Sequence, residues 1–244
     1  MADRALRVCA LYPDLMNIYA DRGNLLLLER RCRWRGIGFE LLSSSLGEAL
    51  DADAADLYYI GGGQDRDQQL CALDLYEVKR DALQHAAERG AVILAVCGGY
   101  QLLGHSYQLA DEQLPGAGLV DLETIRREGP RLIGNVAIEV ELAPGHRRVL
   151  AGFENHGGRT YLGPGARPLG RVLRGHGNND QDGYEGVRAG NVIGTYLHGP
   201  LLPKNVWFAD WLIESALGLG EPLAGLSDEL EAAAHADAVR AAGL

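Results

Sequence analysis

Several features that would place this chain in other classes of protein are absent from its sequence. No apolar run approaches the roughly 18 residues that a membrane-spanning helix needs, and the first residues carry no secretory hydrophobic segment. Basic residues do not predominate. The formal net charge of −10 disfavours nucleic-acid binding, which depends on Lys and Arg neutralising phosphates. We therefore expect a cytoplasmic protein with no membrane anchor and no nucleic-acid partner.

Metal-binding and nucleotide-binding motifs are also lacking. The four cysteines form no CxxC pair and show no Cys/His ligand spacing, which argues against a zinc site and against a disulfide framework. A GxxxxGK[ST] phosphate loop is missing, so we expect no ATP-dependent activation in this chain. Because there is no repeat and no low-complexity linker, we predict one domain over residues 1–244, with a core at about 6–217 and a C-terminal helical tail at 218–244.

The first half contains apolar strands that alternate with helices. The strand-like segments are Leu6–Leu11, Phe39–Leu42, Leu57–Ile60 and Ala91–Val96, and the helical patterns are Asn24–Arg35 and about Gln68–Arg89. This alternation predicts an α/β fold with a mostly parallel sheet flanked by helices, in which ligands bind beyond the carboxyl ends of the strands. We interpret the basic cluster at residues 29–35 as a solvated helix end.

The second half has apolar segments bounded by Gly, Pro, Asn and Asp, which is typical of antiparallel strands and turns. These segments are Ile133–Leu142, Leu150–Glu154, Gly183–Arg188 and Asn191–Leu197. We expect them to extend or flank the parallel sheet. A helix over Leu201–Leu217 should pack back on the core, and Ser227 should cap a final alanine-rich helix that ends near Val239.

The most informative motif is Cys97 followed by two glycines, directly after the predicted strand at residues 91–96. A cysteine on a tight strand-to-helix turn projects above the sheet, and the positive end of the following helix favours its thiolate. The two glycines add nothing to a core but let a substrate approach the backbone. We interpret Cys97 as a nucleophile, with a buried structural cysteine as the alternative.

A cysteine nucleophile needs a general base, which normally comes from elsewhere in the sequence. His198 is the first candidate because it follows a strand-like segment and precedes a Gly-Pro pair, which places it at a sheet end. His156 is the second candidate, and a structural role for both is the alternative. Backbone amides of Gly98 and of the glycine loop at residues 61–63, Gly63 included, are candidates for an oxyanion hole.

The order of these motifs resembles class I glutamine amidotransferases, in the branch that includes cobyric acid synthase. The resemblance is strongest to the glutaminase subunits of lipid II isoglutaminyl synthases, and it covers about residues 6–217. The motifs that carry it are GGGQD at 61–65, VCGGYQLLG at 96–104, YLHGP at 196–200, LYPDLMNIYADRGN at 11–24 and RLIGN at 131–135.

The resemblance implies an α/β amidotransferase fold and a role for each matching residue. Cys97 would be the nucleophile and His198 the base, with the glycine amides lining the oxyanion hole. Arg131 would anchor the glutamine substrate, which suits a guanidinium that can grip a carboxylate at two points; the alternative is a surface arginine that opens a strand. Gln101, on the same helical face as the cysteine, either contacts bound glutamine or braces the turn.

The resemblance also implies a reaction and a partner. The chain would hydrolyse L-glutamine through a thioester and supply ammonia to a Mur-ligase-like synthetase subunit (MurT) in a heterodimer. ATP and Mg²⁺ would belong to that partner, which would amidate the α-carboxylate of D-glutamate in lipid II to D-isoglutamine during peptidoglycan synthesis. The lipid-linked acceptor would be met at the inner face of the membrane.

Two departures from the family pattern concern the catalytic residues. Ala95 stands where many members have glycine, a change that a strand end can absorb. Pro200 replaces the usual glutamate two residues after the histidine, so no local carboxylate orients His198. We therefore predict that a carboxylate of the partner subunit completes the triad. A carboxylate of this chain, Asp14 or Asp21, is the competing candidate.

Three other functions fit these motifs. A cobyrinate- or cobyrate-amidating enzyme shares CGGYQ and YLHG, but such chains carry a synthetase region before the amidotransferase part, and here the first strand begins at Leu6. An independent cysteine hydrolase would act on peptides or esters rather than on glutamine. A non-catalytic binding subunit would keep the fold while Cys97 stayed inert.

Overall fold

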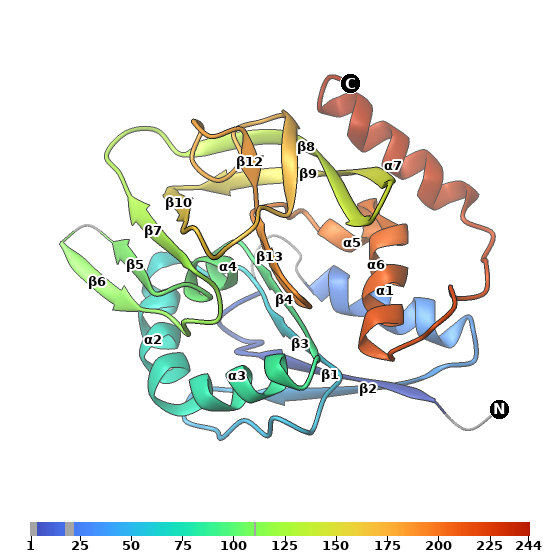
Figure 1. The fold of residues 1–244 in the computed structure, drawn as a ribbon, viewed down its shortest axis with the longest axis horizontal. Helices are drawn as coiled ribbons and strands as arrows, with labels where there is room; N and C mark the ends of the chain where they lie inside the picture. The colour runs from blue at the N-terminus through green and yellow to red at the C-terminus, as the bar shows by residue number, and fades with distance from the viewer. Residues whose placement is uncertain (1–3, 18–21, 110) are drawn as a thin grey trace.

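A six-stranded sheet forms the centre of the computed structural model, which describes residues 4–17, 22–109 and 111–244 (Figure 1). The strand order is β13-β14-β4-β3-β1-β2, and every neighbouring pair is parallel except β13 and β14 at one edge. The strands are β1 (Ala5–Leu11), β2 (Gly38–Ser44), β3 (Leu57–Ile60), β4 (Val92–Val96), β13 (Val187–Ala189) and β14 (Val192–Thr195).

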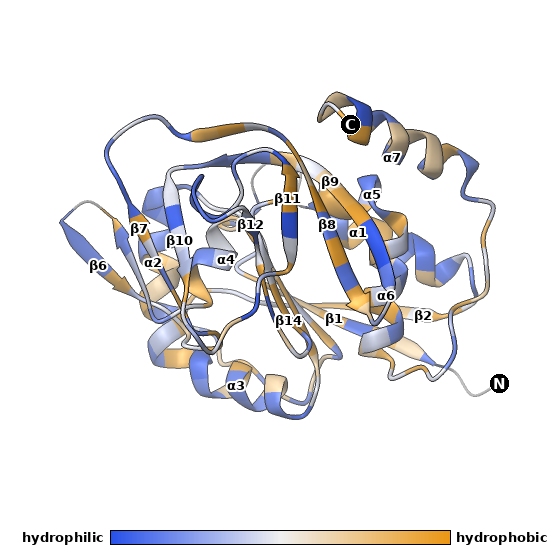
Figure 2. Cartoon of the chain, turned by 45° about the horizontal axis from the view of Figure 1, so that its top comes forward, coloured by the Kyte–Doolittle hydropathy of each residue, from blue (hydrophilic) through white to orange (hydrophobic). Residues whose placement is uncertain are grey.

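Helices cover both faces of this sheet (Figure 1). One face carries α2 (Asp65–Asp74), the π-helical turn η1 (Leu75–Lys79) and α3 (Arg80–Glu88); the other carries α1 (Arg22–Arg33), α5 (Leu201–Lys204) and α6 (Val206–Ala216). Because both faces are covered, every residue of β3, β4 and β14 is buried. Hydrophobic colour is accordingly concentrated in the central strands (Figure 2). Within the part of the chain that the structure describes, no helix has the length and apolar composition to cross a membrane.

Two four-stranded sheets accompany the central one, with the orders β10-β7-β5-β6 and β12-β11-β8-β9. Their strands are β5 (Ser106–Leu109), β6 (Glu112–Pro115), β7 (Leu122–Arg126), β8 (Leu132–Ala143), β9 (His146–His156), β10 (Gly158–Leu162), β11 (Gly170–Arg174) and β12 (Tyr184–Glu185). The last helix, α7 (Glu229–Ala241), packs against β9 and α5. The short helix α4 (Gly98–Leu102) begins directly after β4.

The predicted fold class is confirmed: a mostly parallel α/β sheet is flanked by helices, and the second half of the chain adds antiparallel strands. The segment at residues 191–197 meets the expectation on one side only. Its strand β14 pairs antiparallel with the edge strand β13, as expected, but it pairs parallel with β4 on the other side. β14 therefore joins the antiparallel edge to the parallel sheet, and its carboxyl end lies beside that of β4.

The helix predicted over residues 201–217 is wrong at Asn205. The backbone leaves the helical region there (φ −141°, ψ 62°) and separates α5 from α6. The Asn205 amide accepts a hydrogen bond from the Ala151 backbone at 3.0 Å and donates to the carbonyls of Ala151 and Leu201 at 2.8 Å each. The buried side-chain amide of Asn205 thus binds backbone groups of β9, and this contact explains the break between α5 and α6.

Two expectations about helix ends are also corrected. Asp228, and not Ser227, occupies the N-cap position of α7, and its side chain makes no capping hydrogen bond. Its carboxylate instead accepts from Arg31 at 2.5 Å, and the fully buried Arg31 also pairs with Asp210 at 2.5 Å. The basic cluster at residues 29–35 is therefore more than a solvated helix end, because Arg31 fastens α1 to α6 and to the start of α7.

Candidate active site

Cys97 sits on a strained turn between β4 and α4. Its backbone has φ 52° and ψ −105°, a region that residues with a side chain rarely adopt. Its amide donates to the Thr195 carbonyl at 2.8 Å, and its carbonyl accepts from the Gln101 amide at 3.1 Å. The residue is 5% exposed, and the other three cysteines are equally buried. The backbone conformation, rather than burial, distinguishes Cys97 from them.

Three loops meet at the carboxyl edge of the central sheet. β4 lies between β3 and β14, and all three run in the same direction. The glycine loop at residues 61–63 follows β3, Cys97 follows β4 and His198 lies three residues beyond the end of β14. The paired positions Val96 and Thr195 fix this register, so the nucleophile and the predicted base emerge from neighbouring strands at the same edge.

Close packing requires glycine at both positions that follow Cys97. A Cβ atom at Gly98 would overlap the amide nitrogen of the Gln68 side chain and would lie 2.9 Å from the backbone nitrogen of Gly63. A Cβ atom at Gly99 would lie 2.6 Å from the Ile60 carbonyl oxygen. The two backbones therefore approach each other as closely as glycine permits, and the amide of Gly63 lies against Gly98.

His198 is held against β9 by backbone hydrogen bonds to Phe153. Its amide donates to the Phe153 carbonyl at 2.9 Å and its carbonyl accepts from the Phe153 amide at 3.0 Å, with the two rings edge to face at 5.8 Å. Burial, and then the positive charges of His156, Lys204 and Arg131, lower the pKa of His198 to about 4. Each of these influences opposes protonation of the imidazole.

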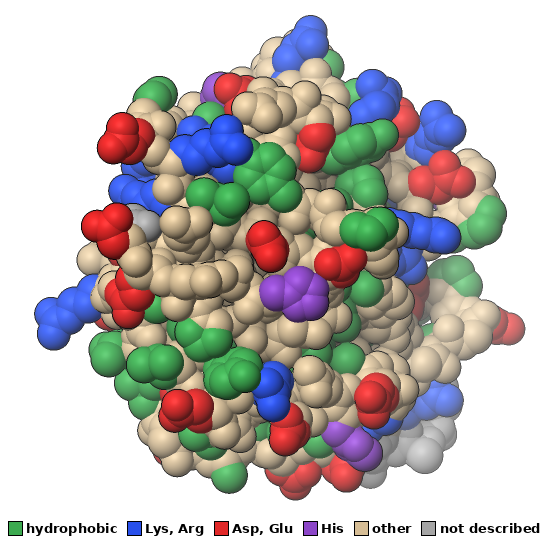
Figure 3. Space-filling model, turned by 60° about the vertical axis from the view of Figure 1, so that its left-hand side comes forward, with side chains coloured by type: hydrophobic (Ala, Val, Ile, Leu, Met, Phe, Trp, Pro, Cys, Tyr) green, Lys and Arg blue, Asp and Glu red, His purple; other side chains and the backbone are tan. Residues whose placement is uncertain are grey.

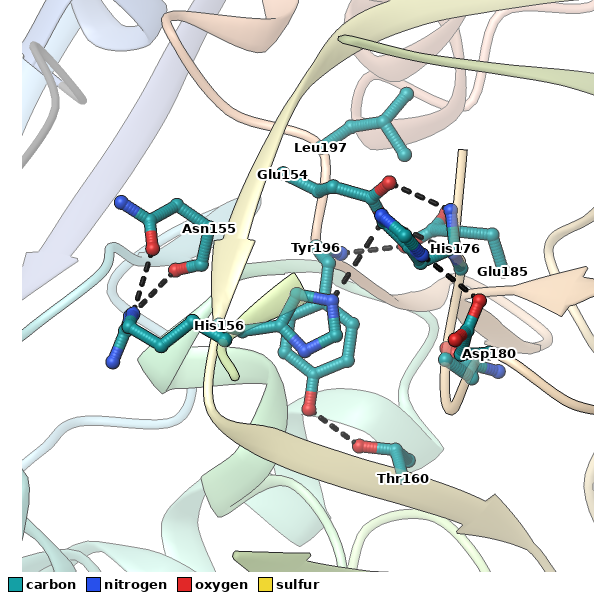
Figure 4. Close-up of polar contacts among 12 residues, drawn as sticks. Glu154, Asn155, His156, Thr160, His176, Asp180, Glu185, Tyr196 and Leu197 are labelled. Atoms are coloured by element: carbon teal, nitrogen blue, oxygen red, sulfur yellow. Dashed lines mark hydrogen bonds and ion pairs between the residues drawn. The ribbon is translucent and has the colours of Figure 1, made fainter. Parts of the chain in front are cut away.

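His156 is built into a separate buried network (Figure 4). Its ring stacks on Tyr196 with centroids 3.5 Å apart, and its Nδ1 lies 2.8 Å from the Gly158 carbonyl oxygen. Its Nε2 lies 3.8 Å from Oε2 of Glu154, whose other carboxylate oxygen, Oε1, accepts from the backbone amide of His176 at 2.7 Å. Burial lowers the pKa of His156. This arrangement fixes the ring as part of the packing beneath the site.

Gln101 lies on α4, one turn after Cys97, and is 3% exposed. Its side-chain oxygen accepts from Gln68 Nε2 at 3.0 Å, and its side-chain nitrogen donates to the Tyr196 hydroxyl at 3.2 Å. The same hydroxyl lies 2.6 Å from the Thr160 hydroxyl. Both ends of the Gln101 amide thus have protein partners, an arrangement that suits bracing of the turn.

Arg131 precedes β8 and lies at the edge of the site. Its guanidinium donates to the side-chain oxygen and to the carbonyl of Asn155, both at 2.7 Å. The side chain is exposed, and its charge contributes to the low pKa of His198. Arg131, directly before β8, therefore places a positive charge close to the predicted base.

Sequence reasoning missed two side chains of the site, Gln68 and Tyr196. Gln68 is on α2, where it shares a buried face with Cys71, Ala72 and Leu75. The signal that could have identified Gln68 is its spacing: it precedes apolar residues by three, four and seven positions, which places it on the inner face of the helix. Tyr196 is completely buried, and burial raises the pKa of its hydroxyl.

Charges elsewhere give no competing site. On the face seen in Figure 3, acidic, basic and apolar side chains are interspersed without a continuous basic area. Within residues 4–17, 22–109 and 111–244, no three or more His, Cys, Asp or Glu side chains are grouped so that they could hold a metal ion. Of the two carboxylates named as competing partners for His198, Asp14 lines a cavity of about 380 Å³ beside α1 and β2, and Asp21 lies outside the described residues.

The parallel sheet, the strained cysteine turn and the adjoining glycine amides together define a glutamine amidotransferase. Residues 7–206 match the model of the CobB/CobQ-like glutamine amidotransferase domain, and the chain belongs to this family. The family predicted from the motifs is thereby confirmed. Two solved structures from Thermotoga maritima share the fold. A chain of PurLQS gives a TM-score of 0.58 at 22% identity, covering 88% of this chain and 99% of that one. A glutamine amidotransferase gives a TM-score of 0.53 at 17% identity, covering 98% of this chain and 94% of that one.

Relatives with named functions are also found. Subunit GatD of the glutamine-hydrolysing lipid II isoglutaminyl synthase of Staphylococcus aureus is 42% identical over 212 residues, which cover 86% of this chain and 84% of the relative. GatD of Streptococcus pneumoniae is 37% identical, with coverages of 87% and 80%. A cobyric acid synthase from Pelotomaculum thermopropionicum is 34% identical; the match covers 81% of this chain but only 38% of the synthase.

Proposed function

We propose that this chain is the glutaminase subunit of a lipid II isoglutaminyl synthase. The observation that carries the proposal is the positive-φ backbone of Cys97 at the edge where Gly98 packs against the backbone nitrogen of Gly63. Such strain persists only where the surrounding structure maintains it, and it is common at nucleophiles. The acceptor is assigned from the names of the two GatD relatives, each of which is matched over most of its length.

The reaction follows from these groups. The Cys97 thiolate attacks the side-chain amide carbon of L-glutamine, and the resulting oxyanion is stabilised by backbone N–H groups of Gly63 and Gly98. His198 takes up the thiol proton and gives it to the leaving nitrogen, which departs as ammonia. Water then hydrolyses the thioester to glutamate and restores the thiol. Arg131 holds the α-carboxylate of the substrate.

The ammonia is used by a second polypeptide. We assign ATP and Mg²⁺ to a Mur-ligase-like partner, MurT, which activates the α-carboxylate of D-glutamate in lipid II so that ammonia converts it to D-isoglutamine. The absence of a GxxxxGK[ST] loop from this sequence supports that division of labour. Because the acceptor is lipid-linked, the heterodimer would work in the cytoplasm at the inner face of the membrane.

The partner is also proposed to complete the catalytic triad. Pro200 occupies the position of the usual family glutamate, and burial, His156, Lys204 and Arg131 lower the pKa of His198. A carboxylate brought in by the partner would raise the pKa of His198 toward neutrality and hold the imidazole in the tautomer that accepts a proton. Within the chain, Glu154 lies beside His156.

The test is to co-purify the chain with Mur-ligase-like proteins and to measure glutamine hydrolysis by the chain alone, by the complex, and by Cys97→Ser and His198→Ala complexes. We expect slow turnover alone, fast turnover in the complex, and near-complete loss for Cys97→Ser. His198→Ala should cost 10²–10⁴-fold, the usual worth of a general base. Asp14→Asn serves as the control for the competing carboxylate and should leave the rate unchanged.

Each part of the proposal has its own contrary outcome. Steady turnover by the isolated chain at the rate of the complex would exclude a triad completed by the partner. A loss below about tenfold in His198→Ala would transfer the base role to His156. An inert Cys97 in a complex that still binds its ligase would indicate a non-catalytic subunit.

A further inference from the structure

A buried acceptor lies beside the predicted oxyanion hole and has no donor. Gln68 is 2% exposed, and its side-chain nitrogen donates to Gln101 at 3.0 Å. Its side-chain oxygen, Oε1, is buried and has no hydrogen-bond partner among the described residues. Leaving a buried acceptor unsatisfied is unfavourable, so such a group generally has a use.

The position of this amide is set by the catalytic turn. The Gln68 head group fills the space that a side chain at position 98 would take: a Cβ atom at Gly98 would overlap its nitrogen and lie 3.1 Å from its Cδ. The same Cβ position is 2.9 Å from the Gly63 backbone nitrogen. The Gln68 amide therefore lies beside Gly98, on the side where Gly98 approaches the backbone nitrogen of Gly63.

The orientation of the amide follows from its hydrogen bonds. Gln68 donates to Gln101, which donates to the Tyr196 hydroxyl, and that hydroxyl lies 2.6 Å from the Thr160 hydroxyl. This chain uses the Gln68 nitrogen and leaves its oxygen for another molecule. The group that binds there must be a hydrogen-bond donor, since Oε1 has only lone pairs to offer.

We propose that Gln68 is a specificity-determining residue of the glutaminase reaction, whose Oε1 accepts a hydrogen bond from the side-chain NH₂ of glutamine bound at Cys97. The inference rests on the proposed function. The carbonyl oxygen of the substrate faces the backbone amides, and its nitrogen faces Gln68. The product glutamate has no such donor, and its carboxylate meets the lone pairs of Oε1, so the site distinguishes substrate from product by hydrogen-bonding capacity.

The experiment compares two substrates with the same carbon skeleton in the complex with the ligase partner. Glutamine carries the N–H donors, whereas the γ-methyl ester of L-glutamate forms the same thioester without them. Gln68→Met keeps the length of the side chain and removes the acceptor. The matched control is Gln69→Met on the same helix, because Gln69 is directed to Glu112, to which it donates at 2.8 Å.

We expect Gln68→Met to lower kcat/KM for glutamine about tenfold, near the usual upper value of one hydrogen bond, and to leave kcat/KM for the ester unchanged. Gln69→Met should match the wild type with both substrates. Alkylation of Cys97 by a diazoketone analogue of glutamine, which also lacks the NH₂ group, should proceed at the wild-type rate in Gln68→Met.

The outcomes separate this inference from the proposed function. Equal losses with amide and ester, or loss of Cys97 alkylation, would mean that Gln68 only supports the turn, and the inference would be overturned while the glutaminase assignment stands. An unchanged amide-to-ester ratio would overturn it as well. Failure of the wild-type complex to hydrolyse glutamine at all would instead overturn the proposed function.

Discussion

Replacement of Glu185 by glutamine should change how stability depends on pH. Glu185 belongs to β12 and is completely buried; it accepts hydrogen bonds from the Tyr196 amide at 2.6 Å and from the Thr195 hydroxyl at 3.0 Å. Burial is the largest influence and raises the pKa of Glu185 to about 8, with the charge of Glu154 acting in the same direction. Glu185→Gln keeps the shape and one acceptor oxygen but removes the titration.

The magnitude follows from the two pKa values. The ordinary value is 4.5, so the unfolded chain loses this proton near pH 4.5, while the folded chain keeps it until about pH 8. The stabilising effect of the protonated carboxyl is fully present below pH 4.5 and declines as pH rises, until the decline is complete above about pH 8. At about 1.4 kcal/mol per pH unit, this amounts to about 5 kcal/mol in total and about 3 kcal/mol between pH 5 and 7.

Urea unfolding of wild type and Glu185→Gln at pH 5, 6, 7 and 8 measures this effect. The difference in unfolding free energy, variant minus wild type, should increase by about 1.4 kcal/mol for each pH unit between pH 5 and 8. Glu88→Gln, an exposed carboxylate on α3, is the control and should follow the wild type. Parallel curves for wild type and Glu185→Gln would show that Glu185 titrates normally, and the argument from burial would be refuted.

Three further perturbations test other parts of the structure. Cys97→Gly should unfold thermally with about 1 kcal/mol more stability than Cys97→Ala, because only glycine relieves the strain at φ 52°; equal melting temperatures would argue against strain. The pKa of His198 is lowered to about 4, so as pH falls below 6.5 the unfolded chain binds a proton at this residue before the folded chain does. The unfolding free energy of wild type should therefore fall by up to about 3 kcal/mol by pH 4. Urea titrations of His198→Asn should not show this decrease. Arg31→Met removes the buried partner of Asp228 and leaves Asp210 paired with Arg35 alone, and it should cost about 1.5–3 kcal/mol in unfolding free energy; a cost below about 1 kcal/mol would show that the cluster is solvated.

The first half of the fold was predictable because its signals are local. The strand at Leu57–Ile60 was predicted with its observed bounds, since four consecutive apolar residues between turns have few other interpretations. The second half depends on contacts between distant segments. The strand in residues 191–197 pairs with β13 on one side and with the distant β4 on the other, and Asn205 breaks a helix because it binds β9. Neither partner is visible in the local pattern.

In the candidate site, too, some residues were predictable from local sequence and others were not. Cys97 and its glycines were recognisable because a strand, a small nucleophile and a tight turn are adjacent in sequence. Gln68 and Tyr196 were not, because a polar residue on a helix and a tyrosine at a strand end acquire meaning only when the chain brings them together. The buried cluster of Arg31 with two aspartates was missed for the same reason, since its partners lie about 180 and 200 residues away.

Geometry and charge are supplied separately at this site. The strained turn at Cys97 and the close approach of Gly63 to Gly98 are complete within one chain, because the strands that carry them are packed on both faces. The charge balance at His198 is different: moving the thiol proton onto its imidazole would add a cation beside Lys204 and Arg131. Under the proposed function, a carboxylate from the partner would stabilise that cation without any movement of the turn. Binding of the partner would then raise the pKa of one imidazole and leave the oxyanion hole as it is, and ammonia would be released in the assembly that can use it.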